Sequence, residues 1–119
     1  KEVRKMILIV EDDRDLRDTL QQVLEEEGYA VTPAPNGIVA LDLLRNISAP
    51  SLVITDVRMP LMNGEQLVAA VREDSKLSSI PIIAISATAE KPIRGASCML
   101  RKPMAIDSLL KLIKTYVNG

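Results

Sequence analysis

Short, almost continuous apolar runs alternate along this chain with longer stretches whose apolar residues recur every three or four positions. A continuous aliphatic run is typical of a strand that is buried on both faces of a sheet. The three-to-four spacing is typical of an amphipathic helix. The runs predict five strands, at residues 6–10, 30–34, 52–56, 80–85 and 98–101.

The helical stretches fall between these runs and after the last one. Residues 13–27 place Leu16, Leu20 and Leu24 on one face, and Gly28 follows as a stop signal. Further helices are predicted to begin near Asn36, Gly64 and Ile106. Regular alternation of strand and helix predicts an α/β fold with a parallel sheet and helices on both faces. Right-handed crossovers then favour a doubly wound five-stranded sheet in the order 2-1-3-4-5.

The composition predicts one globular domain spanning residues 1–119. Apolar residues make up 47% of the chain and charged residues 26%, which is enough apolar surface for a core. A net charge of -1 provides no basic surface for nucleic acid, and no apolar run approaches the roughly 20 residues that span a membrane. No signal peptide is visible and Cys98 is the single cysteine, so a reducing, cytoplasmic location is expected. With no histidine, the chain cannot itself carry a phosphohistidine or a Ser-His-Asp triad.

Polar residues follow the predicted strands at the points where the strands end. Asp12 and Asp13 come just after the first strand, and Asp56 closes the third. Ser86 closes the fourth strand and Lys102 follows the fifth. Open α/β sheets bind ligands beyond the carboxyl ends of their strands, where the winding reverses. In the predicted order the first and third strands are neighbours, so the three carboxylates are expected to converge, with the hydroxyl and the amine opposite.

Three converging carboxylates repel one another, and a hard divalent cation relieves that repulsion. Magnesium prefers oxygen ligands and commonly bridges to a phosphate, and manganese suits the same ligands. A lysine beside the metal adds a compact positive charge, and a hydroxyl adds one hydrogen bond. This combination predicts a site for phosphoryl transfer, a reaction whose catalysis is mostly positioning and charge neutralisation.

Six short motifs, in order along essentially the whole chain, resemble one protein family. They lie at residues 7–13, 36–41, 56–64, 81–87, 95–96 and 102–103. At these spacings they are similar to the receiver domain of bacterial two-component response regulators. The resemblance implies a CheY-like, flavodoxin-like fold and a phosphorylation switch. It also implies self-phosphorylation and its slow reversal, and no conventional enzymatic turnover.

The resemblance implies a role for each residue of the predicted site. Asp56 is the phosphoacceptor, and its donor is a phosphohistidine on a sensor histidine kinase or a histidine phosphotransfer protein. Lys102 pairs with the phosphoryl oxygens, and Ser86 is the switch hydroxyl that turns toward them. The metal ligands are Asp12, Asp13, Asp56 and the backbone carbonyl of Arg58. The residues that shape the adjoining loops are Pro60, Gly64 and Pro103, the last through a cis bond to Lys102.

Two features depart from the family pattern. Three residues before the site lysine the family often has Tyr or Phe, and this chain has Met99, so a tyrosine-type rotamer switch is absent. Only residues 87–97 separate the fourth and fifth strands, where the family normally has a full helix. Pro92 and Gly95 lie within this short segment, so the family's fourth helix is predicted to be missing or vestigial.

Two other functions remain as alternatives. A receiver-like interaction module that works without phosphorylation is compatible with Met99 and the short 87–97 segment. A magnesium phosphatase with an aspartyl-phosphate intermediate commonly has a second Asp two residues after the nucleophile, where this chain has Arg58. The helix face that carries Arg14 and Arg17 is interpreted as either solvated or a kinase-docking surface. Kinase or effector domains linked outside this chain are also compatible with the sequence.

Overall fold

The computed structural model describes residues 4–87 and 91–118. Five strands form one parallel sheet in the order β2-β1-β3-β4-β5, which confirms the predicted order. The strands are β1 (Met6–Val10), β2 (Ala30–Ala34), β3 (Leu52–Asp56), β4 (Ile82–Ser86) and β5 (Cys98–Arg101). The helices are α1 (Arg14–Glu26), α2 (Gly37–Asn46), α3 (Gly64–Glu73) and α4 (Ile106–Asn118).

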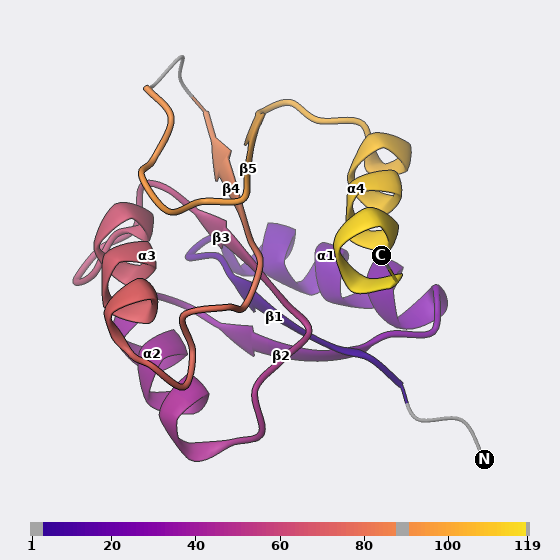
Figure 1. The fold of residues 1–119 in the computed structure, drawn as a ribbon. Coiled ribbons are helices and arrows are strands. Elements are labelled where there is room, and N and C mark those ends of the chain that lie inside the picture. Colours follow the sequence, from indigo (N-terminus) through magenta and orange to yellow (C-terminus); the bar gives the residue numbers. More distant parts are fainter. Residues whose placement is uncertain (1–3, 88–90, 119) are drawn as a thin grey trace.

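Helices cover both faces of the sheet (Figure 1). On one face α1 and α4 bury Leu20, Leu24, Leu109 and Ile113 against the strands. On the other face α2 and α3 bury their own apolar residues against the alternate strand side chains. Because successive strand residues point to opposite faces, the central strands contribute to both cores and must be apolar throughout. Each fully buried aliphatic side chain contributes about 1.5–3 kcal/mol, so these two layers hold the strand ends in place.

Short polar side chains start the first three helices. Asp13 caps α1, and Asn36 caps α2 by accepting the Val39 N–H at 2.9 Å. Asn63 and Gln66 form a reciprocal capping box at the start of α3. Each cap satisfies backbone N–H groups that have no partner within the helix and is worth about 1 kcal/mol. The caps also fix the residue at which each loop at the carboxyl end of the sheet ends and its helix begins.

The connection between β4 and β5 contains no helix in its described residues, 87 and 91–97. This agrees with the prediction for the family's fourth helix, and α4 of this structure instead follows β5. Ile93 of the connection is buried in the core on the α2–α3 side. Gly95 lies in the left-handed region at φ +94, and a Cβ there would sit 3.1 Å from the Arg72 side chain. Arg72 of α3 donates hydrogen bonds to the carbonyls of Ser78, Ile80 and Gly95.

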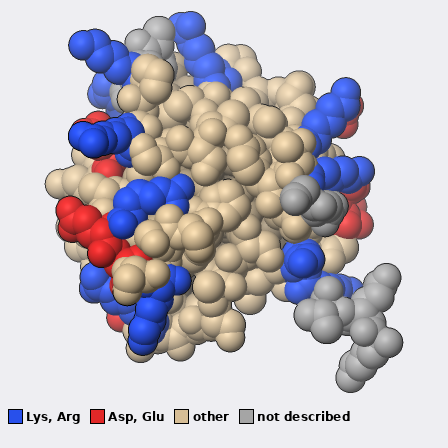
Figure 2. All heavy atoms as spheres, in the orientation of Figure 1, with Lys and Arg blue, Asp and Glu red and all other residues tan. Residues whose placement is uncertain are grey.

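Charged side chains are spread unevenly over the face of the molecule that Figure 2 shows. Figure 2, in the orientation of Figure 1, shows a middle region that is mostly free of charged side chains. Lysines, arginines and acidic residues gather toward the two sides of the view. In the described part of the chain, no helix combines the length and the apolar character needed to cross a membrane.

Candidate functional site

The carboxyl ends of β1 and β3 place two acidic side chains beside each other. Val10 of β1 and Thr55 of β3 are register partners, and Glu11 and Asp56 are the residues that follow them. Strand alternation turns these two side chains to the same side of the sheet. Glu11 is buried at 4% exposure, whereas the next residue, Asp12, is exposed. The strand register therefore assembles the acidic end of the site.

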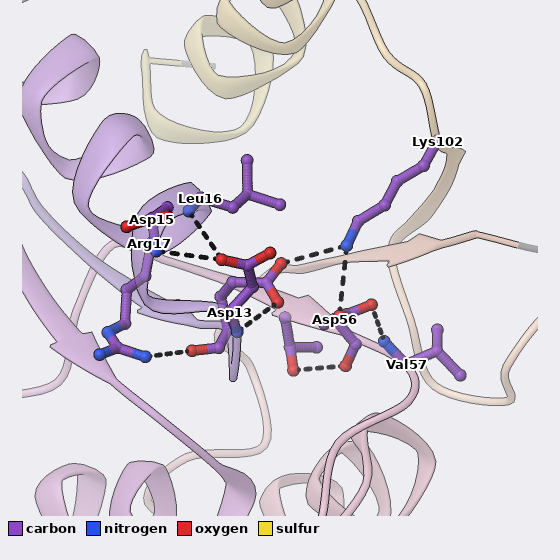
Figure 3. Close-up of polar contacts among 9 residues, drawn as sticks. Asp13, Asp15, Leu16, Arg17, Asp56, Val57 and Lys102 are labelled. Atoms are coloured by element: carbon purple, nitrogen blue, oxygen red, sulfur yellow. Dashed lines mark hydrogen bonds and ion pairs between the residues drawn. The ribbon is translucent and has the colours of Figure 1, made fainter.

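Lys102, which follows β5, reaches across to both carboxylates. Its Nζ lies 3.2 Å from Glu11 Oε1 and 3.3 Å from Asp56 Oδ2 (Figure 3). The other Asp56 oxygen, Oδ1, accepts the Val57 N–H at 2.9 Å. The Lys102 side chain is 24% exposed, whereas those of Glu11 and Asp56 are 5% and 10% exposed. Both oxygens of Asp56 are thus held, one by the backbone and one by an amine that can also bind an incoming anion.

The charges at this site are not balanced by Lys102 alone. Burial raises the pKa of Glu11 from 4.5 to about 7, and the charge of Asp56 adds to the rise, while the Asp13 N–H partly opposes it. Burial by itself lowers the pKa of Lys102, but the charges of Asp56 and Glu11 outweigh it and raise the pKa overall. The two shifts thus have different main causes, burial for Glu11 and neighbouring carboxylates for Lys102, but the charge of Asp56 raises the pKa of both groups.

Three carboxylates could hold a cation at this end of the sheet. Glu11, Asp12 and Asp56 each have one oxygen within 4.8 Å of the others'. Oxygen donors from two neighbouring loops suit a hard divalent ion such as Mg²⁺.

Asp13 does not join this group, which corrects the sequence prediction. Its Oδ1 accepts the N–H groups of Asp15 and Leu16 at 3.0 and 3.2 Å, as the N-cap of α1 (Figure 3). A carboxylate engaged by the first turn of a helix is turned away from the strand ends. Glu11 occupies the position in the cluster that we had expected for Asp13.

The loop between β3 and α3 forms one wall of the site. An open hollow of about 530 Å³ is lined by Asp12 together with loop residues that include Arg58 and Pro60. Gly64, the first residue of α3, donates its N–H to the Val57 carbonyl at 2.8 Å. A Cβ at Gly64 would overlap the Asp56 carbonyl oxygen, so this close approach of α3 to β3 requires glycine. The loop therefore lies beside the acidic cluster with Asp12 at its edge.

The remaining predicted residues lie at the ends of β4 and β5. Ser86 is one position beyond Ile85, the register partner of Asp56, and is 4% exposed. Its carbonyl accepts the Lys102 N–H at 2.7 Å, and the Lys102–Pro103 peptide bond is cis, as the family resemblance implied. Met99 is half-buried against the core on the α2–α3 side. The structure thus places Ser86 and Lys102 at the same end of the sheet as Asp56.

Sequence reasoning missed two contributors to the site. Glu11 could have been found from the strand register, because it is the residue opposite Asp56 once β1 and β3 are aligned. Arg17 was assigned to a charged surface of α1, yet its Nη1 donates to the Glu11 carbonyl at 2.8 Å. No pattern in the sequence distinguishes Arg17 from its exposed neighbour Arg14.

Together the fold and the site define a doubly wound α/β domain with an acidic, lysine-bearing pocket where the winding reverses. The sequence profile of the response regulator receiver domain matches residues 7–114, and the chain belongs to that family. It is therefore a receiver domain of two-component signalling.

Named relatives agree with this assignment along most of their length. The polar-differentiation response regulator DivK of Brucella anthropi is 31% identical over 96% of this chain and 97% of its own. The receiver domain of a signal transduction histidine kinase from Syntrophus aciditrophicus is 30% identical, with a TM-score of 0.89 over 97% of this chain and 91% of that one. Response regulator TrrA of Thermotoga maritima, solved in complex with Mg²⁺-BeF, is 29% identical, with a TM-score of 0.85 over 94% and 98%.

Proposed function

We propose that residues 1–119 form one receiver domain that accepts a phosphoryl group on Asp56. The observation that carries this proposal is the position of the Asp56 carboxylate, 3.3 Å from Lys102 Nζ and clustered with Glu11 and Asp12. A carboxylate can attack a phosphoryl group only where the negative charges of both are offset. Here the Lys102 amine contacts both Asp56 and Glu11, and the carboxylate cluster offers ligands for a cation beside it.

The proposed donor is a phosphohistidine on a sensor histidine kinase or a histidine phosphotransfer protein. A carboxylate oxygen of Asp56 attacks the phosphorus, and the phosphorus–nitrogen bond of the donor breaks. The imidazole leaves with the electron pair of that bond and takes up a proton from solvent. Water later attacks the same phosphorus, the bond between phosphorus and the Asp56 oxygen breaks, and inorganic phosphate leaves with the Asp56 carboxylate restored. The domain modifies itself in this scheme and turns over no free substrate.

The cation ligands fit Mg²⁺, or Mn²⁺ with the same preference for oxygen. Glu11, Asp12 and Asp56 would hold the ion, and the backbone carbonyl of Arg58 at the edge of the hollow would complete the protein ligands. The ion supplies charge neutralisation to the phosphoryl oxygens when bound. Asp13 is left out of this ligand set because its carboxylate caps α1.

The switch would come from contacts made only in the phosphorylated state. Phosphorylation adds about -1.5 to -2 charges, which Lys102 and the Ser86 hydroxyl would then bind. A ligand shifts a conformational equilibrium only through such differential contacts. The half-buried Met99 replaces the aromatic switch residue, so repacking of a flexible thioether would report the change. The partner kinase and any covalently linked domains lie outside this chain.

The test is phosphorylation by a small phosphodonor followed by intact-mass spectrometry. With Mg²⁺ we expect one phosphoryl adduct that hydroxylamine removes, and no adduct when a chelator replaces the metal. Asp56→Asn should show no adduct. Asp18→Asn is the matched control, because Asp18 is exposed on α1 and pairs only weakly with Arg14 at 3.8 Å, and it should behave as wild type.

The alternative function predicts the opposite result in the labelling experiment. A receiver-like interaction module that works without phosphorylation would show no adduct in any of these proteins. The short connection without a described helix, and Met99, are the features that would favour it. A wild-type protein that binds Mg²⁺ but takes no phosphoryl group would decide for that alternative.

A further inference from the structure

Glu11 lies just beyond the hydrogen-bonded part of β1, yet its backbone is fixed on both sides. Its N–H donates to the Ala34 carbonyl at the end of β2, at 3.0 Å. Its carbonyl accepts from Arg17 Nη1 at 2.8 Å, across the first turn of α1 (Figure 3). A backbone carbonyl in a part-buried position is normally paired with a donor, and here the donor is the Arg17 guanidinium.

The turn between β1 and α1, residues 11–13, is also hydrogen-bonded to α1 at its other end. The Asp13 N–H donates to Glu11 Oε2 at 3.2 Å, and the Asp13 carboxylate caps the helix. The Arg17 N–H donates to the Asp13 carbonyl at 2.9 Å. The amide bond to Asp13 is the first backbone hydrogen bond of α1, and the guanidinium bond to the Glu11 carbonyl is the contact that depends on the arginine side chain. The two carboxylates of the turn that face the cation site, those of Glu11 and Asp12, stand on a backbone that Arg17 holds.

We infer that Arg17 is a positioning residue for cation binding at the Glu11, Asp12 and Asp56 cluster. It touches neither the cation nor the phosphoryl group, and acts by fixing the backbone from which two of the three ligands project. The inference rests on the proposed function, since it presumes that this cluster binds Mg²⁺. Partners that hold metal ligands in place typically change metal affinity by about 10- to 100-fold when they are removed.

Two effects of replacing Arg17 would change the Mg²⁺ affinity in opposite directions. Arg17 is a cation near a cation site, so removing its charge alone would tighten Mg²⁺ binding by weakening repulsion. Removing its hydrogen bond to Glu11 would loosen the turn and weaken Mg²⁺ binding. The sign of the change therefore separates a positioning role from a simple effect of charge.

The experiment is an Mg²⁺ titration followed by amide NMR on folded protein without any phosphodonor. Arg17→Met removes the donors and the charge but keeps a long side chain with good helix propensity. We expect its dissociation constant for Mg²⁺ to rise about 10-fold. Arg17→Lys keeps the charge but loses the planar fork, and we expect its dissociation constant to rise as well, by a smaller factor.

Arg14→Met is the matched control on the same helix. Arg14 is 84% exposed and its charged partner is Asp18, so this variant makes the same charge change without touching the turn. We expect its Mg²⁺ affinity to equal that of wild type or to be slightly higher. Wild-type or tighter binding by folded Arg17→Met and Arg17→Lys would overturn the inference.

A kinetic readout separates positioning from general damage to the fold. With a small phosphodonor, Arg17→Met should need about 10-fold more Mg²⁺ for half-maximal labelling, while labelling at saturating Mg²⁺ stays within about threefold of wild type. A fall in the saturating rate with an unchanged Mg²⁺ requirement would contradict the inference. Absence of saturable Mg²⁺ binding in the wild type would overturn the proposed function itself, and this inference with it.

Discussion

The turn between β1 and α1 and the connection between β4 and β5 both leave the carboxyl end of the sheet, but they are built in opposite ways. In the turn, Glu11 and Asp13 are each engaged through backbone and side chain, and Arg17 joins them. The connection is irregular in its described residues and is held against α3 by a buried Ile93 and by the Arg72 guanidinium. The turn holds two of the proposed cation ligands, whereas the connection has no helix in its described residues, where the family resemblance implied one.

Under the proposed function, this difference separates the residues of the phosphorylation site from the connection between β4 and β5. The strand ends bring Glu11, Asp56 and Lys102 together, with Lys102 Nζ 3.2 and 3.3 Å from the two carboxylates. In its described residues, 87 and 91–97, the connection between β4 and β5 has no helix, and it exposes Lys91 and Arg94. We therefore expect ordinary chemistry at Asp56 and partner contacts that differ from those made by a receiver with a full fourth helix.

Lys102 should give the largest effect of any substitution near the site other than at Asp56. Lys102→Met leaves the Glu11 and Asp56 carboxylates without the amine that lies 3.2 and 3.3 Å from them. We expect labelling by a small phosphodonor to slow by about 100-fold or more, because a fixed charge at the phosphoryl oxygens is lost. Lys111→Met, on the exposed side of α4, should label at the wild-type rate. A labelling rate that falls less than threefold in Lys102→Met would contradict a role for this lysine at the phosphoryl oxygens.

A substitution at Gly64 tests how closely α3 packs against the end of β3 that carries Asp56. Gly64→Ala places a Cβ on the Asp56 carbonyl oxygen and 2.9 Å from the Val57 Cα. We expect the free energy of unfolding to fall by about 3 kcal/mol in urea denaturation. Gly28→Ala is the contrasting variant, because Gly28 has φ +97 but nothing within 4 Å of a Cβ, and it should lose only about 1 kcal/mol. Equal losses would contradict the close-approach argument.

Arg72 tests whether the two regions are independent. Arg72→Met removes the donors to three carbonyls around the β4–β5 connection, so the free energy of unfolding should fall by about 2 kcal/mol. The Mg²⁺ affinity and the rate of labelling by a small phosphodonor should stay within about twofold of wild type. Arg45→Met, at an exposed position in the last turn of α2, should change the unfolding free energy little. A large change in Mg²⁺ affinity would show that the connection also shapes the site.

Glu11 should give the smallest effect on stability, with a sign set by its pKa. The pKa of Glu11 is about 7 in the folded protein and 4.5 ordinarily, so the unfolded chain loses this proton first as pH rises. In a chelator, the wild type should therefore lose stability relative to Glu11→Gln as pH rises from 4.5 to 7. The full linkage value is about 3 kcal/mol, and solvent screening reduces the expected loss to about 1 to 2 kcal/mol.

Urea denaturation of both proteins across this pH range would measure the Glu11 effect. The wild type should match Glu11→Gln below pH 4.5 and be the less stable protein above pH 7. Glu11→Gln should also bind Mg²⁺ more weakly, since it lacks one carboxylate of the cluster. A wild type that gains stability relative to Glu11→Gln as pH rises would reverse the sign and contradict the burial argument.

The sequence predicted the sheet order, the position of Asp56 and the approach of Lys102, because strand ends in a parallel sheet are set by hydrophobic runs alone. It assigned the wrong acidic neighbour to Asp56. Glu11, Asp12 and Asp13 are consecutive acids, and which of them faces the site depends on the register of β1 against β3 and on the cap of α1. Both are tertiary properties that a run of three acids does not display.

The role of Arg17 was beyond sequence reasoning for a similar reason. Arg14 and Arg17 are both basic residues near the start of α1, and only the position of the Glu11 carbonyl distinguishes them. In contrast, the lack of a helix in the described part of the β4–β5 connection was predicted from segment length, since residues 87–97 are too few for a long helix and its two loops. Segment length is a local property, and side-chain contacts across a turn are not.

The central claim is that Asp56, and no other carboxylate of the cluster, accepts the phosphoryl group. The most direct measurement is borohydride reduction of the phosphorylated protein, which converts an aspartyl phosphate to homoserine, followed by peptide mapping. The account predicts homoserine at position 56 alone, formed only when Mg²⁺ is present during labelling. Homoserine at position 12 or 13, or none in a protein that had taken up a phosphoryl group, would contradict it.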